Sequence, residues 1–148
     1  MDLTCQVEVV DYTESVDGDL TAGLAQLCCF ALDLESASGE WSVTLVLTSD
    51  EHLTKLHDDF MGIPEPTDIM TFPDDDAPGG DIVISVDQAE RQRHDDAWPL
   101  AQELRFLVVH GALHLTGWDD ATTDQRAAML DRQRAIIDAF QNDPSRIR

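Results

Sequence analysis

Two histidines four residues apart could bind one metal ion between them. On a helix, side chains at positions 110 and 114 point the same way, so the imidazoles of His110 and His114 can reach a single ion. Gly117 permits the positive-φ turn that ends a helix and brings the chain back. Asp119 or Asp120 can then supply a third ligand. The alternative is a pair of helix histidines that only pack or accept hydrogen bonds.

The spacing of these residues also resembles the metzincin metalloprotease pattern HExxHxxGxxH, with an aspartate in the last place. This spacing favours His110, His114 and Asp120 as the ligands. The proteases use the glutamate after the first histidine as general base, and Gly111 at that place argues against proteolysis. Three protein ligands leave one coordination position open for water, as in catalytic zinc sites. We therefore predict a hydrolase with one Zn²⁺ ion, whose bound water is the nucleophile and whose general base is unassigned.

Length and composition predict one domain over residues 1–148. A chain of 148 residues with 43% hydrophobic residues can bury a core of its own. No apolar run reaches the roughly 18 residues that a membrane span requires, and the first residues lack the layout of a signal peptide. We expect a cytoplasmic protein that does not enter the membrane.

The net charge of −21 arises from 30 acidic residues against 9 basic ones, and Lys55 is the only lysine. A field of this sign repels phosphates over most of the surface. Binding of nucleic acid would therefore need a locally positive site, made by a metal ion or by a few arginines. An acidic surface of the kind found in salt-adapted proteins is the simpler interpretation. Aspartate runs such as 74–76 and 95–96 lie beside Pro, Gly or helix ends and are interpreted as solvated loops.

The three cysteines, Cys5, Cys28 and Cys29, form no CxxC pattern and are odd in number. The sequence therefore suggests neither a disulfide framework nor a thiolate zinc site. We expect them to be small core residues.

Hydrophobic periodicity predicts helices and strands in alternation along most of the chain. Asp17 or Asp19 could cap the first helix, Ser49 or Asp50 the second, and Gly117 follows the helix that carries the two histidines. The order of elements indicates an α+β domain with a small mixed sheet of about four strands packed with helices, although strand pairing cannot be deduced. The predicted strands cover 5–11, 41–48, 69–72 and 81–85, and the predicted helices cover 20–34, 51–60, a segment beginning at 85 or 87, 100–115 and 122–140.

Three sequence blocks resemble those of the YbeY endoribonucleases, also called UPF0054. The metal motif of that family, HGxLHLxGYDH, is matched by HGALHLTGWDD over 110–120. A block close to PTDVLSFP is matched by PTDIMTFP over 66–73, and the family block GDIVIS occurs over 80–85. The blocks occur in the family order, and the resemblance covers about residues 40–140.

This resemblance implies a bacterial cytoplasmic protein that binds zinc and cuts single-stranded RNA. It further implies action in 16S rRNA 3′-end maturation and in late-stage ribosome quality control, with the ribosome or its small subunit as partner. The implied fold is a small mixed sheet packed with helices. The local chemistry agrees, because a metal ion with an open position can activate water and neutralise phosphoryl charge.

The chain departs from the family pattern at two positions. The family places an arginine, a natural stabiliser of phosphate charge, where this chain has Met61. Arg105 or Arg91 could contribute instead, although the sequence places neither at the site. Asp120 replaces the last histidine of the motif, which lowers the charge around the ion by one unit and makes bound water somewhat less acidic.

Other residues of these segments have competing interpretations. Thr67 and Asp68 could line the cleft and contact substrate, or could cap a turn. Trp118 is interpreted as packing beside the metal loop, with base stacking as the alternative. His52, His57 and His94 lack ligand spacing and are expected to be surface histidines or to bond a partner group.

Two other functions remain open at this stage. One is a zinc-dependent hydrolase of another small or peptide substrate, which the acidic surface and Met61 favour. The other is a non-catalytic ribosome-assembly factor that uses the metal for structure.

Overall fold

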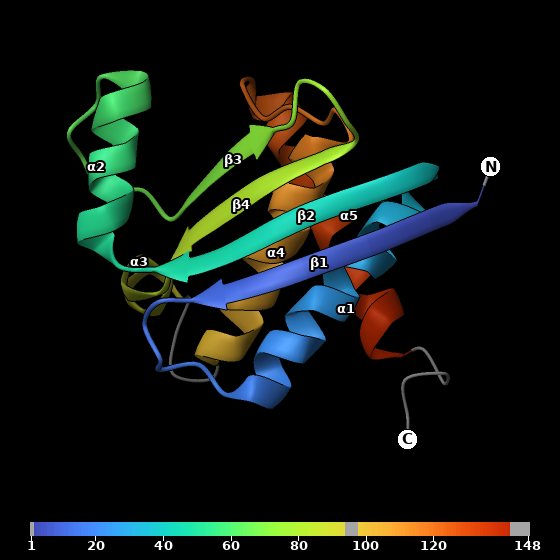
Figure 1. Ribbon diagram of the computed structural model, residues 1–148, viewed down its shortest axis with the longest axis horizontal. Helices are drawn as coiled ribbons and strands as arrows, with labels where there is room; N and C mark the ends of the chain where they lie inside the picture. Colours follow the sequence, from blue (N-terminus) through green and yellow to red (C-terminus); the bar gives the residue numbers. More distant parts are fainter. Residues whose placement is uncertain (1, 94–97, 143–148) are drawn as a thin grey trace.

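The computed structural model describes residues 2–93 and 98–142, which form four strands and five helices (Figure 1). In chain order the elements are β1 (Leu3–Asp11), α1 (Gly18–Leu34), β2 (Gly39–Thr48), α2 (Asp50–Met61), β3 (Ile69–Pro73), β4 (Gly79–Ser85), α3 (Val86–Gln92), α4 (Leu100–Leu115) and α5 (Thr123–Gln141). Each predicted element is present, with ends that differ by a few residues. Asp17, Ser49 and Ser85 cap α1, α2 and α3.

The four strands form one mixed sheet in the order β1-β2-β4-β3. The strands β1, β2 and β4 run parallel, and β3 pairs antiparallel with β4 at the edge. The predicted α+β class with a small mixed sheet of about four strands is confirmed. The order of the strands, which the sequence did not reveal, places β3 at an edge, where it can border a cleft.

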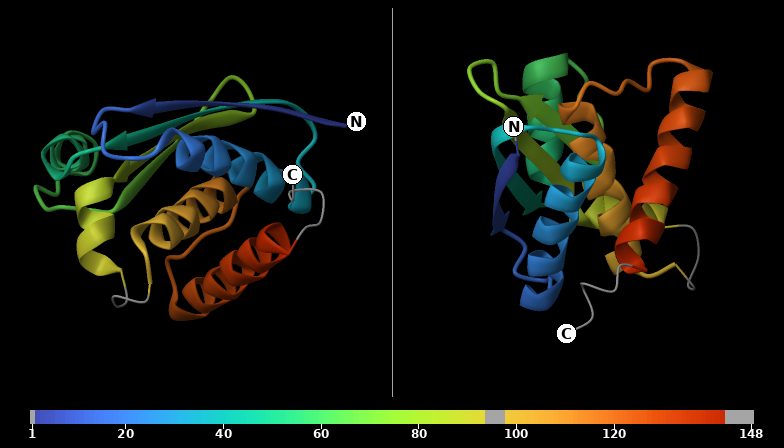
Figure 2. Two further views of the ribbon diagram at one scale, coloured as in Figure 1. Left: turned by 90° about the horizontal axis from the view of Figure 1, so that it is seen from below. Right: turned by 90° about the vertical axis from the view of Figure 1, so that its right-hand side faces the viewer.

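The helices α1, α4 and α5 lie on one side of the sheet (Figure 2). Alternate residues of the strands face them, so Val43, Leu45 and Leu47 of β2 are almost fully buried together with Ile82 and Ile84 of β4. The helices α1 and α4 pack side by side beneath the sheet, and α5 packs against both of them. This arrangement makes α4 the central helix, buried between the sheet and α5.

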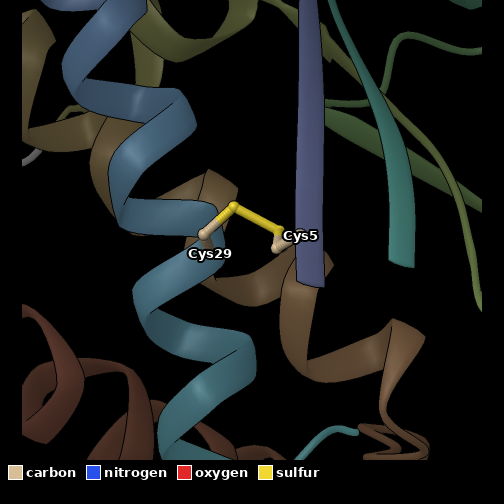
Figure 3. The surroundings of a disulfide bond; sticks show 2 residues. All are labelled: Cys5 and Cys29. Atoms are coloured by element: carbon tan, nitrogen blue, oxygen red, sulfur yellow. A yellow bond between two sulfur atoms is a disulfide. The ribbon is translucent and has the colours of Figure 1, made fainter. Parts of the chain in front are cut away.

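A disulfide bond joins Cys5 of β1 to Cys29 of α1 (Figure 3). The expectation that all three cysteines are free core residues is therefore wrong for this pair. Cys5 lies on the face of β1 that packs against the core, and α1 runs back along that face, which brings the two Cα atoms to 5.8 Å. The odd cysteine count concealed the pair, because Cys28, which is buried and free, is the residue left over.

Among the described residues we find no helix whose length and hydrophobicity would let it cross a lipid bilayer.

Candidate metal centre

The helix α4 and the turn after it bring three ligand groups together. His110 and His114 lie one turn apart on α4, with their Nε2 atoms 3.1 Å from each other. The chain then turns through Gly117, whose φ of 106° suits glycine. Asp120 returns toward the helix, and its Oδ2 lies 3.3 Å from Nε2 of His110 and 3.5 Å from Nε2 of His114. The structure thus brings together the three residues that were predicted from the sequence to be ligands.

The hydrogen bonds of the two imidazoles determine which nitrogen carries the proton. Nδ1 of His114 lies 3.0 Å from the backbone oxygen of Trp118, which can only accept, so this nitrogen donates. Nδ1 of His110 lies 3.1 Å from Oε1 of Gln133, whose Nε2 donates to the backbone oxygen of Phe106. Nδ1 of His110 therefore donates as well. In the neutral rings, both Nε2 atoms then carry lone pairs and face each other.

The two Nε2 atoms and Oδ2 of Asp120 are three electron-pair donors with no proton between them. A divalent cation requires this arrangement of its ligands. Bonds of about 2.0–2.1 Å from a tetrahedral ion to its ligands would place ligand atoms about 3.4 Å apart. The observed separations of 3.1, 3.3 and 3.5 Å are close to this value. Burial lowers the pKa of His110, which favours its neutral, ligand form. His110, His114 and Asp120 could therefore hold a metal ion.

Gln133 of α5 is a site residue that our sequence reasoning missed. Its side chain is 1% exposed and orients the ring of His110 through the bond to Nδ1. A signal was present in the sequence, because Gln133 lies at helical spacing among the buried residues Met129, Ile136 and Ile137. A polar residue on the apolar face of a helix needs a partner, and here that partner is a candidate metal ligand.

The three candidate ligands open onto a cleft of about 430 Å³ between α4 and the edge strand β3. Thr67 and Asp68, which precede β3, line this cleft. Asp68 also accepts a hydrogen bond of 2.7 Å from Gln92 Nε2, and the Thr67 hydroxyl lies 3.5 Å from the oxygen of Ile69. Both residues are therefore placed where a substrate could touch them, and Asp68 also bonds within the protein.

Gly111 has a packing role that explains the absence of a protease-type glutamate. A Cβ atom at this position would lie 2.8 Å from Cγ2 of Ile82, which is fully buried on β4. Glycine lets α4 approach the sheet closely, and a longer side chain at position 111 would enter the core rather than the cleft. The structure therefore leaves no room for a general base at this place.

The position of the family arginine lies apart from the candidate ligands. Met61 is the last residue of α2 and is 62% exposed, and it is not among the described residues that line the cleft. Arg91 forms an ion pair with Asp50, and Arg105 donates to Gln102 Oε1 at 3.2 Å. Neither arginine lines the described part of the cleft, so neither takes the place of the missing one there.

The remaining residues singled out in the sequence have structural partners. Trp118 packs against the core and donates a 2.6 Å hydrogen bond to Glu35, which supports the packing interpretation. His52 contacts the Thr48 hydroxyl through Nδ1 at 2.9 Å, and Nδ1 of His57 lies 2.8 Å from the oxygen of Glu65. These two histidines bond partner groups, as expected. His94 and the aspartates 95–96 lie outside the described residues.

Comparison with known proteins identifies the family. The model of the family described as Endoribonuclease YbeY matches residues 6–141. The chain belongs to the endoribonuclease YbeY family. The YbeY resemblance inferred from three short blocks is thereby confirmed over nearly the whole chain.

Several YbeY proteins of bacteria are similar to this chain over most of their length. An endoribonuclease YbeY of Moorella thermoacetica is 36% identical, with 91% of this chain and 96% of that protein covered. One of Parasynechococcus marenigrum is 34% identical, with coverage of 94% and 77%, and one of Bacillus velezensis is 29% identical, with coverage of 90% and 94%. A solution structure of a Thermotoga maritima protein has the same fold, with a TM-score of 0.66, 22% identity and 95% of each chain covered.

Proposed function

We propose that this protein is a zinc-dependent endoribonuclease that hydrolyses phosphodiester bonds in single-stranded RNA. We place the protein in the cytoplasm, where it would act in 16S rRNA 3′-end maturation and in late-stage ribosome quality control. Its partners would be precursor rRNA and the ribosome or its small subunit. Membership of the YbeY family supports the reaction and the substrate. The observation that carries the proposal is the cluster of His110 Nε2, His114 Nε2 and Asp120 Oδ2 at the wall of an open cleft.

A bound metal ion would also offset the negative charge of this protein near the substrate. With a net charge of −21, most of the surface repels an RNA backbone. A bound Zn²⁺ ion would supply local positive charge, Lewis acidity toward a phosphoryl oxygen, and a lowered pKa of coordinated water. Because the three side chains leave a position open toward the cleft, substrate can approach from that side.

The side chains around this position would hold and orient the substrate. Gln133 and the carbonyl of Trp118 keep the two imidazole rings turned with Nε2 toward the cleft. Thr67 offers a hydroxyl that can donate to a phosphate or ribose oxygen. Asp68 accepts a hydrogen bond from Gln92 through Oδ2, and on the cleft side its carboxylate can accept a proton or a hydrogen bond from a ribose hydroxyl.

The test is cleavage of matched single-stranded and duplex oligoribonucleotides by zinc-loaded protein. We expect cutting of the single strand alone, and loss of cutting both with a chelator and in His114→Ala. His52→Ala is the matched control, because His52 is an exposed histidine of α2 and should leave cleavage unchanged. Equal cutting by wild type and His114→Ala would show a contaminating nuclease and refute the proposal. Cleavage confined to small phosphodiesters or peptides, or ribosome binding without cleavage, would also refute it.

A further inference from the structure

A second hollow of about 420 Å³ continues the metal cleft between α4 and α5. The two spaces share Asp68, Ile69, His110 and Asp120 in their walls, so the candidate metal centre lies where they meet. The size is in the range of about 300–1,000 Å³ that is common for small-ligand pockets. A polymeric substrate that crosses the candidate metal site can therefore extend into this hollow.

The walls of the hollow combine an aromatic ring with a cation. Phe106 precedes His110 by four residues, so it lies on the same face of α4, about 6 Å along the helix axis. Opposite it, α5 contributes Leu130, which is 39% exposed, and Arg134. An aromatic ring and a positive charge in one hollow are the combination by which proteins bind single-stranded nucleic acid without reading its sequence.

Two of the three acidic side chains that line the hollow, Asp68 and Glu103, already have hydrogen-bond donors, and the third, Asp120, is a candidate metal ligand. Nε2 of Gln92 donates to Asp68 at 2.7 Å and to Glu103 at 3.0 Å, and Nε1 of Trp98 donates to the other oxygen of Glu103 at 2.9 Å. Arg134 is the only arginine or lysine among the described residues that line the hollow. Its contact with Asp131 is an exposed pair at 3.5 Å, which a phosphate can replace with little loss.

A third, smaller hollow of about 230 Å³ extends the path away from the metal centre. Phe106 and Arg134 line this hollow as well as the second one, and Trp98 lies in its wall. The rings of Trp98 and Phe106 meet edge to face, with centroids 6.0 Å apart. Arg134 therefore stands at the junction of two hollows, where a backbone phosphate between two nucleotides would pass.

The second and third hollows together form one groove that leads away from the candidate metal centre. We propose that this groove binds the single-stranded RNA on one side of the cleavage point. The base next to the scissile phosphate would lie in the second hollow against Phe106, and Arg134 would bind the following phosphate. This proposal rests on the proposed ribonuclease function and names the part of the protein that holds its substrate. Arg134 would thereby supply, from α5, a phosphate contact that Met61 cannot provide.

The first experiment compares Arg134→Ala with Arg126→Ala. Both variants remove one exposed positive charge from α5, but only Arg134 lines the groove. With a single-stranded oligoribonucleotide and zinc-loaded protein, we expect Arg134→Ala to raise KM about tenfold with little change in kcat. The slope of log KM against log salt should fall by about 0.7, the value for one phosphate contact on a single strand. Equal KM and equal slope in the two variants would overturn the role of Arg134.

The second experiment tests the base position, first with wild-type protein and then with a variant of Phe106. An abasic site is moved one nucleotide at a time along a fixed oligoribonucleotide, and binding to metal-free protein is followed by fluorescence anisotropy. Loss of stacking on Phe106 should weaken binding about tenfold at one position beside the cleavage point. Phe106→Leu, checked for folding by its Tm, should remove this dependence. If the abasic site weakens binding equally at every position, the proposed base site at Phe106 is wrong.

These measurements separate failure of the groove from failure of the proposed function. Without any cleavage of RNA by wild type, the ribonuclease proposal fails, whatever the variants do. With cleavage by wild type and identical behaviour of Arg134→Ala and Arg126→Ala, only the groove fails. Anisotropy with metal-free protein gives the same comparison of the two variants without reference to activity.

Discussion

Oε1 of Gln133 lies 3.1 Å from Nδ1 of His110 and links α5 to the candidate metal centre on α4. The amide nitrogen of the same side chain donates to the oxygen of Phe106 at 3.2 Å, so its orientation is defined at both ends. The ring of His110 is thereby turned with Nε2 toward His114 and Asp120. Groups that orient metal ligands in this way strengthen metal binding although they do not touch the ion.

We predict that Gln133→Met weakens zinc binding about 10–100-fold. The methionine fills a similar volume but gives Nδ1 of His110 no strong acceptor. Gln133→Glu keeps an acceptor for Nδ1 of His110 but loses the bond to Phe106, so it should bind zinc more tightly than Gln133→Met does. Isothermal titration of the metal-free proteins measures both affinities. If Gln133→Met binds zinc as wild type does, the orienting role of Gln133 is wrong.

The choice of Asp120 over its neighbour as a ligand can be tested directly. Asp120 Oδ2 is within 3.5 Å of both Nε2 atoms, whereas Asp119 Oδ1 accepts a hydrogen bond from the backbone N–H of Asp120 at 2.8 Å. Asp120→Ala should therefore lose most bound metal, and Asp119→Ala should keep it. Metal content after dialysis, measured by atomic emission, decides between them. The ligand assignment fails if both variants hold equal amounts.

Local sequence patterns were enough to predict α4 and the turn at Gly117 that brings Asp120 to the two histidines. These features depend on residues within about ten positions of one another, and helical spacing and glycine conformation determine their geometry. The caps at Asp17 and Ser49 are local for the same reason. The three candidate ligands could therefore be chosen before the fold was known.

Contacts between distant segments could not be predicted in this way. Gln133 reaches His110 across 23 positions, and Cys5 meets Cys29 only because α1 runs back along β1. The strand order, with β3 at the edge beside α4, depends on packing of the whole chain. The groove that ends at Arg134 depends on the same packing, since its walls come from α4, α5 and the segment before β3.

Reduction of the disulfide should destabilise the protein. The bond between Cys5 and Cys29 closes a loop of 24 residues, for which loop-closure entropy predicts about 3 kcal/mol. In a chain of this size that corresponds to a fall in Tm of about 10 °C on adding dithiothreitol. Burial raises the pKa of the Cys28 thiol to about 12, so this cysteine should not exchange with the pair.

The double variant Cys5→Ala/Cys29→Ala is the control for this measurement. Its Tm should be low and should not respond to dithiothreitol. A wild-type Tm that is also insensitive to the reductant would show that the two thiols are unpaired in the purified protein, and the predicted stabilisation by the disulfide would then be wrong.

Salt should stabilise the folded state at neutral pH. The net charge of −21 makes the acidic side chains repel one another, and added ions screen this repulsion. We expect Tm at pH 7 to rise as NaCl increases from 0.05 to about 1 M. Near the sequence pI of about 4.1, where the net charge is close to zero, the same series should have a much smaller effect. Equal salt effects at the two pH values would exclude charge repulsion as their cause.

Alanine at Gly111 should destabilise the protein, although alanine favours helices. The added methyl group would lie 2.8 Å from Cγ2 of Ile82 in the core, and overpacking of this kind costs about 1–3 kcal/mol. The gain in helix propensity is about 1 kcal/mol, so we expect a net loss of roughly 1 kcal/mol in the free energy of unfolding.

Gly23 provides the matched control, because it lies within α1 and an added Cβ would meet nothing within 4 Å. Gly23→Ala should therefore raise the free energy of unfolding by about 0.5–1 kcal/mol. Urea denaturation of the two variants, followed by circular dichroism, measures both changes. If both substitutions stabilise the protein, Gly111 is not needed for close packing of α4 against β4, and the lack of a glutamate there needs another explanation.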